Sequence, residues 1–362
     1  MKIAGVRLEP CVLRKHDPNW CFARGASPVT EGVIVTIRGE DGTEGYGYAS
    51  ATPHMGATRD TLLAALNAFT PLVSAQDSFD LMRIMQRLDR ELAGQAQAKA
   101  AIDCALHDLN AKVLGLPLYQ LFGGKLRDSL PILRILAIKT PPEMAAQAET
   151  LVNAGYHHLK IKVEGDVAQD VARVAAIRER IGNSIHLTID ANQAYTVKDA
   201  IAALNRMAAH NIDLAEQPVA ASDLVGLKLV TDSVDVTVEA DESADSLDAV
   251  FRLVAERIVD SISLKIPKLG GLRNALAAAQ ICEAGQVACR MGAAVGSRLL
   301  SAHALHVAAA LPVSHYACEL GEFDRLSDDP FTGIEIESGC LKIPNIPGCG
   351  ATPRPTAKAA LA

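Results

Sequence analysis

The sequence predicts an α/β protein: a (β/α)8-type barrel with an N-terminal α+β capping domain that the C-terminal segment completes. Three observations support this prediction. The first 50 residues alternate between apolar and polar positions, as antiparallel strands do. From about residue 126, short apolar runs alternate with amphipathic helical stretches, which is typical of a parallel sheet. The Gly- and Pro-rich tail 326–362 is too short for a domain of its own and is expected to pack on the capping domain.

The capping domain, residues 1–125, is expected to contain three antiparallel strands followed by helices. Segments 2–13 and 31–50 have strand patterns, and Asp41-Gly42 within the second predicts a hairpin turn. From about residue 58 to Gly115, apolar residues recur at helical spacing. The segment 16–28 between the first two strands reads as a polar loop that contains Gly and Pro.

The barrel domain, residues 126–325, is expected to contain eight parallel strands separated by helices. The segments with strand patterns are 131–138, 157–163, 185–190, 214–218, 236–242, 261–266, 287–292 and 315–320. Strands that alternate with helices in this number predict a closed barrel.

Composition excludes several classes of protein. The net charge of −7 and the absence of a dense basic run argue against a nucleic-acid partner. No run of 18 apolar residues predicts a membrane-spanning helix, and charged residues interrupt the N-terminus where a signal peptide would be apolar. The eight cysteines form no CxxC pair, so we expect a reducing, cytoplasmic location and no zinc site.

Five consecutive predicted strands each end in one ionisable side chain. These residues are Lys162, Asp190, Glu216, Asp241 and Lys265, at intervals of 24 to 28 residues. That interval is about one β/α unit, and barrel enzymes place their catalytic groups at the C-terminal ends of the strands. A lone lysine pair in a strand is commonly a solvated edge, and a lone Asp commonly caps a helix. Five such residues on one rim favour a catalytic centre.

Three carboxylates on adjacent strands would repel one another without a cation. Mg²⁺, with Mn²⁺ as a substitute, is the cation that Asp190, Glu216 and Asp241 would suit, because hard ions prefer carboxylate oxygens. Lys160 and Lys162 point to the same side of their strand, since side chains two apart share a face. A second ammonium group is expected to lower the pKa of Lys162 toward a usable base, or to hold a substrate carboxylate.

The ordered motifs resemble the enolase superfamily, in the muconate lactonizing enzyme subgroup (the mandelate racemase/muconate lactonizing enzyme family). The matching pieces are KIK at 160–162, DANQAY at 190–195, EQP at 216–218, ADES at 240–243 and LKIPKLGG at 264–271. Residues 101–124 resemble the helix that leads into the barrel, and residues 329–350 resemble the C-terminal return. The resemblance therefore covers essentially the whole chain.

The resemblance implies a role for each of the five ionisable residues at the strand ends, and for Lys160. Asp190, Glu216 and Asp241 would bind Mg²⁺, and Lys162 and Lys265 would act as acid and base on opposite faces of the substrate. Lys160 would orient a carboxylate oxygen or lower the pKa of Lys162. The loop 16–28 would close over the site. The further candidates for substrate contact or support of the centre are Asn192, Glu242, Lys268, Arg298, Glu319 and Trp20.

Three features distinguish branches of this subgroup. The mandelate racemase branch places a His after the seventh strand, and CRMGAAVGS has none. A Glu that is frequent in the seventh-strand segment is replaced by Gly296, with Arg298 nearby. Dipeptide epimerases have an acidic D-x-D at the eighth strand, where this chain has Glu319 and Gly321. We expect Glu319 at the barrel mouth, away from the three metal carboxylates, where it meets a substrate amine, caps a helix or pairs with a loop Arg.

These expectations define a function hypothesis. The enzyme would abstract the proton α to a carboxylate through an enediolate, giving racemisation, epimerisation or cycloisomerisation of a small carboxylic acid or amino acid derivative. Dehydration of a hydroxy acid or hydroxyproline-like substrate uses the same residues and stays open. A non-catalytic acid-binding barrel is disfavoured because the catalytic set is intact, and a zinc hydrolase because the rim lacks His ligands. The resemblance also implies a homo-oligomer.

Overall fold

The computed structural model describes residues 1–311 and 316–355 of the chain. Its N-terminal part is an antiparallel sheet in the order β14-β1-β4-β5. The strands of this sheet are β1 (Ile3–Lys15), β4 (Val29–Gly39), β5 (Glu44–Ser50) and the short β14 (Leu326–Ser327). The hairpin predicted at Asp41-Gly42 is confirmed, and Gly42 has the positive φ of 86° that such a turn requires.

Three helices pack on this sheet: α1 (Arg59–Val73), α2 (Leu81–Glu91) and α3 (Ala96–Val113). The Ala-rich α3 approaches β5 so closely that only glycine fits opposite it. A Cβ atom on Gly47 would lie 1.9 Å from the Ala101 carbonyl oxygen, and one on Gly45 would lie 2.2 Å from that of Ala105. The small residues of α3 and β5 therefore let the helix that leads into the barrel pack directly against the N-terminal sheet.

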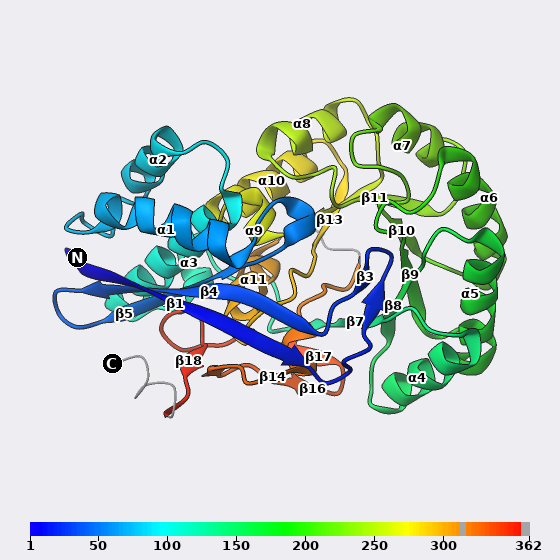
Figure 1. The fold of residues 1–362 in the computed structure, drawn as a ribbon, viewed down its shortest axis with the longest axis horizontal. Coiled ribbons are helices and arrows are strands. Elements are labelled where there is room, and N and C mark those ends of the chain that lie inside the picture. Colours follow the sequence, from blue (N-terminus) through cyan, green and yellow to red (C-terminus); the bar gives the residue numbers. More distant parts are fainter. Residues whose placement is uncertain (312–315, 356–362) are drawn as a thin grey trace.

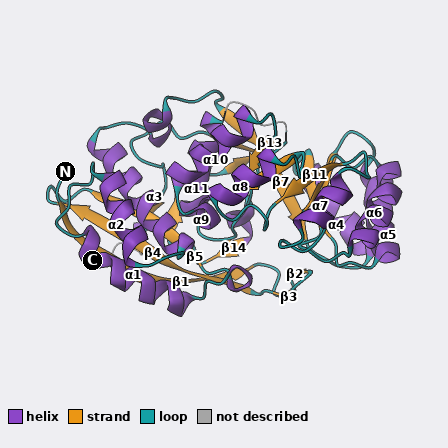
Figure 2. Cartoon of the chain, turned by 90° about the horizontal axis from the view of Figure 1, so that it is seen from above, coloured by secondary structure: helices purple, strands orange, loops and turns teal. Residues whose placement is uncertain are grey.

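The second part is a curled sheet of seven parallel strands in sequence order (Figures 1 and 2). The strands are β7 (Leu133–Leu136), β8 (His158–Lys162), β9 (His186–Asp190), β10 (Leu214–Glu216), β11 (Thr237–Ala240), β12 (Ser261–Leu264) and β13 (Ala288–Met291). Helices follow each strand and lie on its outer side, as α5 and α6 show in Figure 2. The helices are α4 (Pro141–Asn153), α5 (Val167–Ile181), α6 (Val197–Met207), α7 (Leu224–Thr231), α8 (Leu247–Ala255), α9 (Ile266–Leu269), α10 (Leu272–Ala284) and α11 (Arg298–Ala310).

The prediction of an eighth barrel strand at 315–320 is wrong for the part that the structure describes. Position 315 lies outside the described residues, and 316–320 form one isolated bridge, between Cys318 and Ile132. The Cys318 carbonyl accepts from Leu133 N at 3.0 Å, and Glu319 N donates to the Met291 carbonyl at 2.9 Å. Hydrogen bonds to both edges let this segment close the gap between β7 and β13 without extending as a strand.

Short strands join the two ends of the chain to the barrel. A three-stranded sheet contains β16 (Ile336–Glu337), β17 (Cys340–Lys342) and β6 (Ser129–Pro131), and a two-stranded one contains β15 (Phe331–Thr332) and β18 (Thr352–Pro353). The loop after β1 forms a hairpin of β2 (Cys21–Phe22) and β3 (Gly25–Ala26), which reaches across to the barrel near β8 (Figure 1). In the described chain, no helix combines the length and apolarity needed to cross a membrane.

Candidate active site

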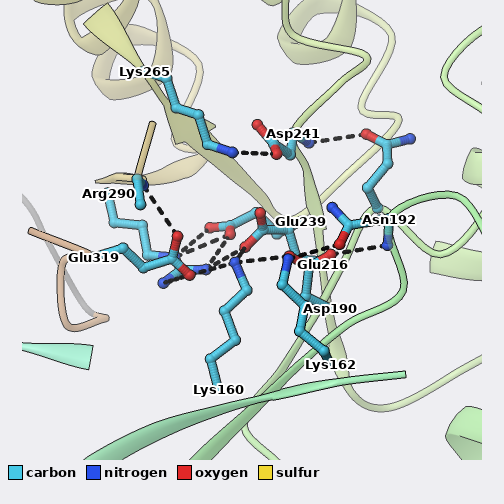
Figure 3. Close-up of polar contacts among 12 residues, drawn as sticks. Lys160, Lys162, Asp190, Asn192, Glu216, Glu239, Asp241, Lys265, Arg290 and Glu319 are labelled. Carbon is cyan, nitrogen blue, oxygen red and sulfur yellow. Dashed lines mark hydrogen bonds and ion pairs between the residues drawn. The ribbon is translucent and has the colours of Figure 1, made fainter. Parts of the chain in front are cut away.

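The register of the parallel sheet brings the predicted ionisable residues to one rim. Lys162 is the Cα partner of Asp190 across β8 and β9, and Asp190 is the partner of Glu216 across β9 and β10. Asp241 and Lys265 follow directly after the last residues of β11 and β12. All five side chains therefore meet at the C-terminal ends of the strands (Figure 3).

Lys160 is the centre of a buried ion network. Its Nζ lies 2.9 Å from Asp190 Oδ2 and 2.7 Å from Glu216 Oε2, and it also pairs with Glu319. Burial lowers the pKa of Lys160, but the neighbouring carboxylates, Asp190 first, outweigh burial and raise it well above its usual value. Lys160 is thus a fixed positive charge at the base of the rim.

The two predicted acid/base lysines stand beside different carboxylates. Lys162 Nζ lies 2.5 Å from Asp190 Oδ2 and 2.6 Å from Asn192 Oδ1. Lys265 Nζ lies 2.5 Å from Asp241 Oδ2. Figure 3 shows Lys162 and Lys265 approaching the carboxylates from two sides. Burial lowers the pKa of Lys265, while Asp241 raises it and prevails.

Two further predicted residues support this centre. Lys268 Nζ donates to Asp241 Oδ1 at 2.7 Å and to the Asp241 carbonyl at 2.5 Å. Asn192 donates its Nδ2 to Glu242 Oε1 at 3.3 Å and so connects Glu242 to Lys162. These contacts hold the carboxylates and lysines in fixed positions.

Glu319 is not separated from the predicted metal carboxylates as we expected. It belongs to the same ion network as the predicted metal carboxylates, because it pairs with Lys160 and lies 3.8 Å from Arg290 Nη1. Its Oε2 accepts from Ala293 N at 3.0 Å. Burial raises the pKa of Glu319, but Lys160 and Arg290 together lower it to about 2. The segment that contains Glu319 runs between β7 and β13, and the Glu319 side chain lines the site.

Arg290 and Glu239 form a second buried pair that the sequence analysis missed. Arg290 Nη2 lies 2.7 Å from Glu239 Oε1 and 2.6 Å from Glu216 Oε2, and both side chains are fully buried. Ser261 donates its hydroxyl to Glu239 Oε2 at 2.9 Å. The sequence did contain a signal for this pair, because Glu239 interrupts the apolar run VTVEAD and Arg290 interrupts the apolar run VACRMG.

Gln217 was also missed, although it lies in the EQP motif. Its Oε1 accepts from the backbone N–H groups of Asp241 and Ser243, at 2.9 and 3.0 Å. Gln217 has a φ of 37°, a conformation that non-glycine residues rarely adopt. The turn after β10 therefore fixes the start of the turn after β11.

A cavity of about 560 Å³ opens above the ionisable groups. Eight of the twelve predicted site residues line it, and the four that do not are Glu216, Glu242, Lys268 and Arg298. Arg298 instead packs its guanidinium 4.4 Å from the Phe323 ring centroid and donates to the Ile334 carbonyl.

Residues of the loop 16–28 line this cavity, as the resemblance implied. Trp20 and Phe22 line the cavity with their ring centroids 5.6 Å apart. Lys162 Nζ lies 5.8 Å from the centre of the Phe22 ring. His54, which we did not predict, also lines the cavity.

The donor set fits a hard divalent cation. Asp190, Glu216 and Asp241 offer only oxygen ligands, which Mg²⁺ prefers. Within the described chain, buried Glu216 Oε1 has no hydrogen-bond partner, while Oε2 of the same carboxylate is held by Lys160 and Arg290. Buried carboxylate oxygens are normally satisfied. An unpaired oxygen on the middle carboxylate is what a metal ligand requires.

The fold and the site together define a class of protein: α/β enzymes whose curled parallel sheet carries buried carboxylates and lysines at the C-terminal ends of its strands. The chain belongs to the mandelate racemase/muconate lactonizing enzyme family of the enolase superfamily. Residues 11–123 match the mandelate racemase/muconate lactonizing enzyme N-terminal domain, and residues 143–357 match the enolase C-terminal domain-like family.

Relatives and solved structures agree with this assignment. A hydrophobic dipeptide epimerase from Enterococcus faecalis is 39% identical over 81% of this chain and 82% of its own length. A chloromuconate cycloisomerase from Pseudomonas putida is 36% identical over 77% and 76%. The crystal structure of a dipeptide epimerase from Enterococcus faecalis V583, complexed with Mg and L-Leu-L-Tyr, gives a TM-score of 0.94 at 35% identity, covering 97% and 100%. The relatives are isomerases, and the chain is an enzyme of this superfamily.

Proposed function

We propose that the protein is a Mg²⁺-dependent racemase or epimerase of a small carboxylic acid or amino acid derivative. It would remove the proton α to the carboxylate from one face and return a proton to the other. The observation that supports this most directly is the pair of lysines, Lys162 and Lys265, which line one cavity and approach it from two sides (Figure 3).

Each residue of the site has a defined task in this proposal. The Nζ atom of one lysine, in its neutral form, would take the α-proton, and the other lysine, as an ammonium ion, would deliver a proton to the opposite face. The permanent charge of Lys160 would attract a substrate carboxylate oxygen, and the loop with Trp20 and Phe22 would exclude water. Bound by Asp190, Glu216 and Asp241, Mg²⁺ would supply the positive charge that stabilises the enediolate.

Cycloisomerisation is the second candidate. The eighth segment of this chain carries the single acid Glu319 followed by Gly321, and the Glu319 carboxylate is already paired with Lys160. It is therefore not free to meet a substrate ammonium group as the acidic pair of dipeptide epimerases would. In a cycloisomerase or a dehydratase, one lysine would suffice for proton transfer, and the same residues would hold the carboxylate.

Proton NMR in D₂O with Mg²⁺ separates these outcomes. A library of chiral N-acyl amino acids, dipeptides and hydroxy acids is incubated with the enzyme, and the α-proton signal is followed. A racemase or epimerase exchanges this proton and yields both stereoisomers. Exchange without stereochemical change, or loss of a β substituent, would replace the proposal by a one-base reaction, and no exchange with any α-carboxylate would overturn it.

A further inference from the structure

Lys15 is a buried cation without a carboxylate partner. Five lysines are buried in the described part of the chain: Lys15, Lys99, Lys160, Lys162 and Lys268. The last four each have a carboxylate oxygen within 2.9 Å. Lys15 is only 7% exposed, yet its Nζ donates to the Ser27 carbonyl at 2.6 Å, and no described Asp or Glu oxygen lies within 4.0 Å of it. Burial of an uncompensated charge is costly, so it requires an explanation.

A second cation increases the positive charge at this position. The Lys15 Nζ lies 4.0 Å from the centre of the Trp20 ring, and the guanidinium carbon of Arg325 lies 5.9 Å from the same ring. Arg325 is already compensated, because its Nε lies 2.5 Å from Glu322 Oε2. Burial, followed by repulsion from Arg325, lowers the pKa of Lys15 to about 8. One positive charge is therefore left without a counter-ion.

Lys15 faces the cavity that holds the reacting centre. It lines the main cavity together with Lys162 and Asp190, and it also lines a neighbouring cavity of about 240 Å³ that contains Arg134 and Arg325. The rings of Trp20 and Phe22 form a continuous wall from Lys15 to Lys162. A substrate whose α-carboxylate lies at the metal centre can thus extend along this wall toward Lys15.

We propose that Lys15 binds a second anionic group of the substrate, so that the enzyme acts on acids that carry a second carboxylate. This inference rests on the proposed function, which places the first carboxylate at the metal centre. One uncompensated ammonium matches one carboxylate, whereas a doubly charged phosphate would be left partly unneutralised. Charge-assisted hydrogen bonds of this kind are stronger than neutral ones and set orientation as well as affinity.

Calorimetry on the Mg²⁺-loaded enzyme tests the inference without turnover. The probes are succinate, glutarate and adipate, each compared with the monocarboxylate of the same chain length. The wild type is expected to bind at least one diacid about tenfold or more tightly than its matched monoacid. Lys15→Met should abolish this preference, and Lys15→Arg should retain part of it. Equal affinities in the wild type, or equal losses on both acids in Lys15→Met, would overturn the inference.

Two controls separate recognition from a structural role in the loop. Lys139→Met removes another loop contact, since Lys139 Nζ lies 3.0 Å from Asp17 Oδ2, but Lys139 does not line the main cavity. This variant should affect diacid and monoacid equally. Trp20 is the only tryptophan in the sequence, so its fluorescence reports on the ring beside Lys15. Diacid binding should change this fluorescence in the wild type and not in Lys15→Met, and a diacid preference without that change would place the anion elsewhere.

The inference and the proposed function fail in different ways. If no acid exchanges its α-proton, the proposed function is wrong, whatever the diacid preference. If a monoacid exchanges its α-proton and the diacid binds no better, the proposed function stands and the role of Lys15 is wrong.

Discussion

Lys160 Nζ lies 2.7 Å from Glu216 Oε2, the same carboxylate oxygen that Arg290 Nη2 contacts at 2.6 Å. Two cations hold one oxygen of Glu216, and the other oxygen has no hydrogen-bond partner in the described chain. This asymmetry leaves Oε1 available to the metal ion of the proposed function. It connects the proposed metal site to the buried pair beneath it.

The first prediction concerns the metal. Glu216→Gln and Asp190→Asn should each weaken Mg²⁺ binding by more than about tenfold, because an amide replaces a charged ligand. Titration calorimetry measures this directly, and a chelator should abolish turnover while circular dichroism stays unchanged. Full activity in chelator-treated buffer would contradict a metal-dependent mechanism.

A second prediction concerns Arg290, which we expect to position Glu216 rather than to touch the substrate. Arg290→Met should cost about 3–5 kcal/mol of unfolding free energy, because it leaves Glu239 buried without its partner. The double variant Arg290→Met, Glu239→Met should recover much of that stability. Both variants should still bind Mg²⁺ about tenfold to a hundredfold more weakly, since an outer-shell partner of a ligand is lost. If the stable double variant binds Mg²⁺ like the wild type, Arg290 has only a structural role.

The lysines yield a stereochemical prediction. Lys162→Ala should stop α-proton exchange from one stereoisomer and Lys265→Ala from the other, because each lysine serves one face of the substrate. NMR in D₂O with each pure stereoisomer as substrate provides the measurement. Retention of full turnover by both variants would rule out the two-base mechanism, and dependence on a single lysine would favour cycloisomerisation or elimination.

Glu319 leads to a prediction opposite to the one that its position in the sequence suggested. If Glu319 met a substrate amine at the barrel mouth, as the sequence suggested, its substitution would weaken activity only on substrates that carry an amine. In the structure Glu319 pairs with buried Lys160. Glu319→Gln should therefore lower kcat/KM equally for aminated and non-aminated acids. The test is a matched pair of such acids, assayed on both proteins. A loss confined to the aminated acid would restore the role as an amine contact.

Much of this architecture could be predicted because its signals are local. The alternation of strands and helices, and charges at strand ends such as Asp190 and Lys265, survive in a single sequence. The shape of the eighth segment could not be predicted, since its pairing depends on a gap between β7 and β13 that only the curled sheet defines. The same holds for the buried contacts of Arg290, whose partners lie on other strands: Glu239 is 51 residues away and Glu216 is 74 residues away. Lys160, the ion-pair partner of Glu319, lies on β8.

The last prediction concerns pH and follows from Lys15. The charged groups around Lys15 are Arg325, Glu322 and Lys162, with Arg134, Asp324, His16 and Asp17 along the smaller cavity. Because burial and Arg325 lower the pKa of Lys15 to about 8, its side chain is charged below that pH and neutral above it. The preference for a diacid over its matched monoacid should therefore fall as the pH rises through about 8.

The lowered pKa of Lys15 also changes how the stability of the protein depends on pH. Between pH 8 and the ordinary lysine value of 10.5, the unfolded chain binds a proton that the folded chain does not, so this group makes stability rise with pH. Lys15→Met should remove that rise, which urea unfolding at a series of pH values measures. Calorimetry over the same range measures the diacid preference. A preference that stays constant from pH 7 to above 9 in the wild type would show that Lys15 is not the group that binds the second carboxylate.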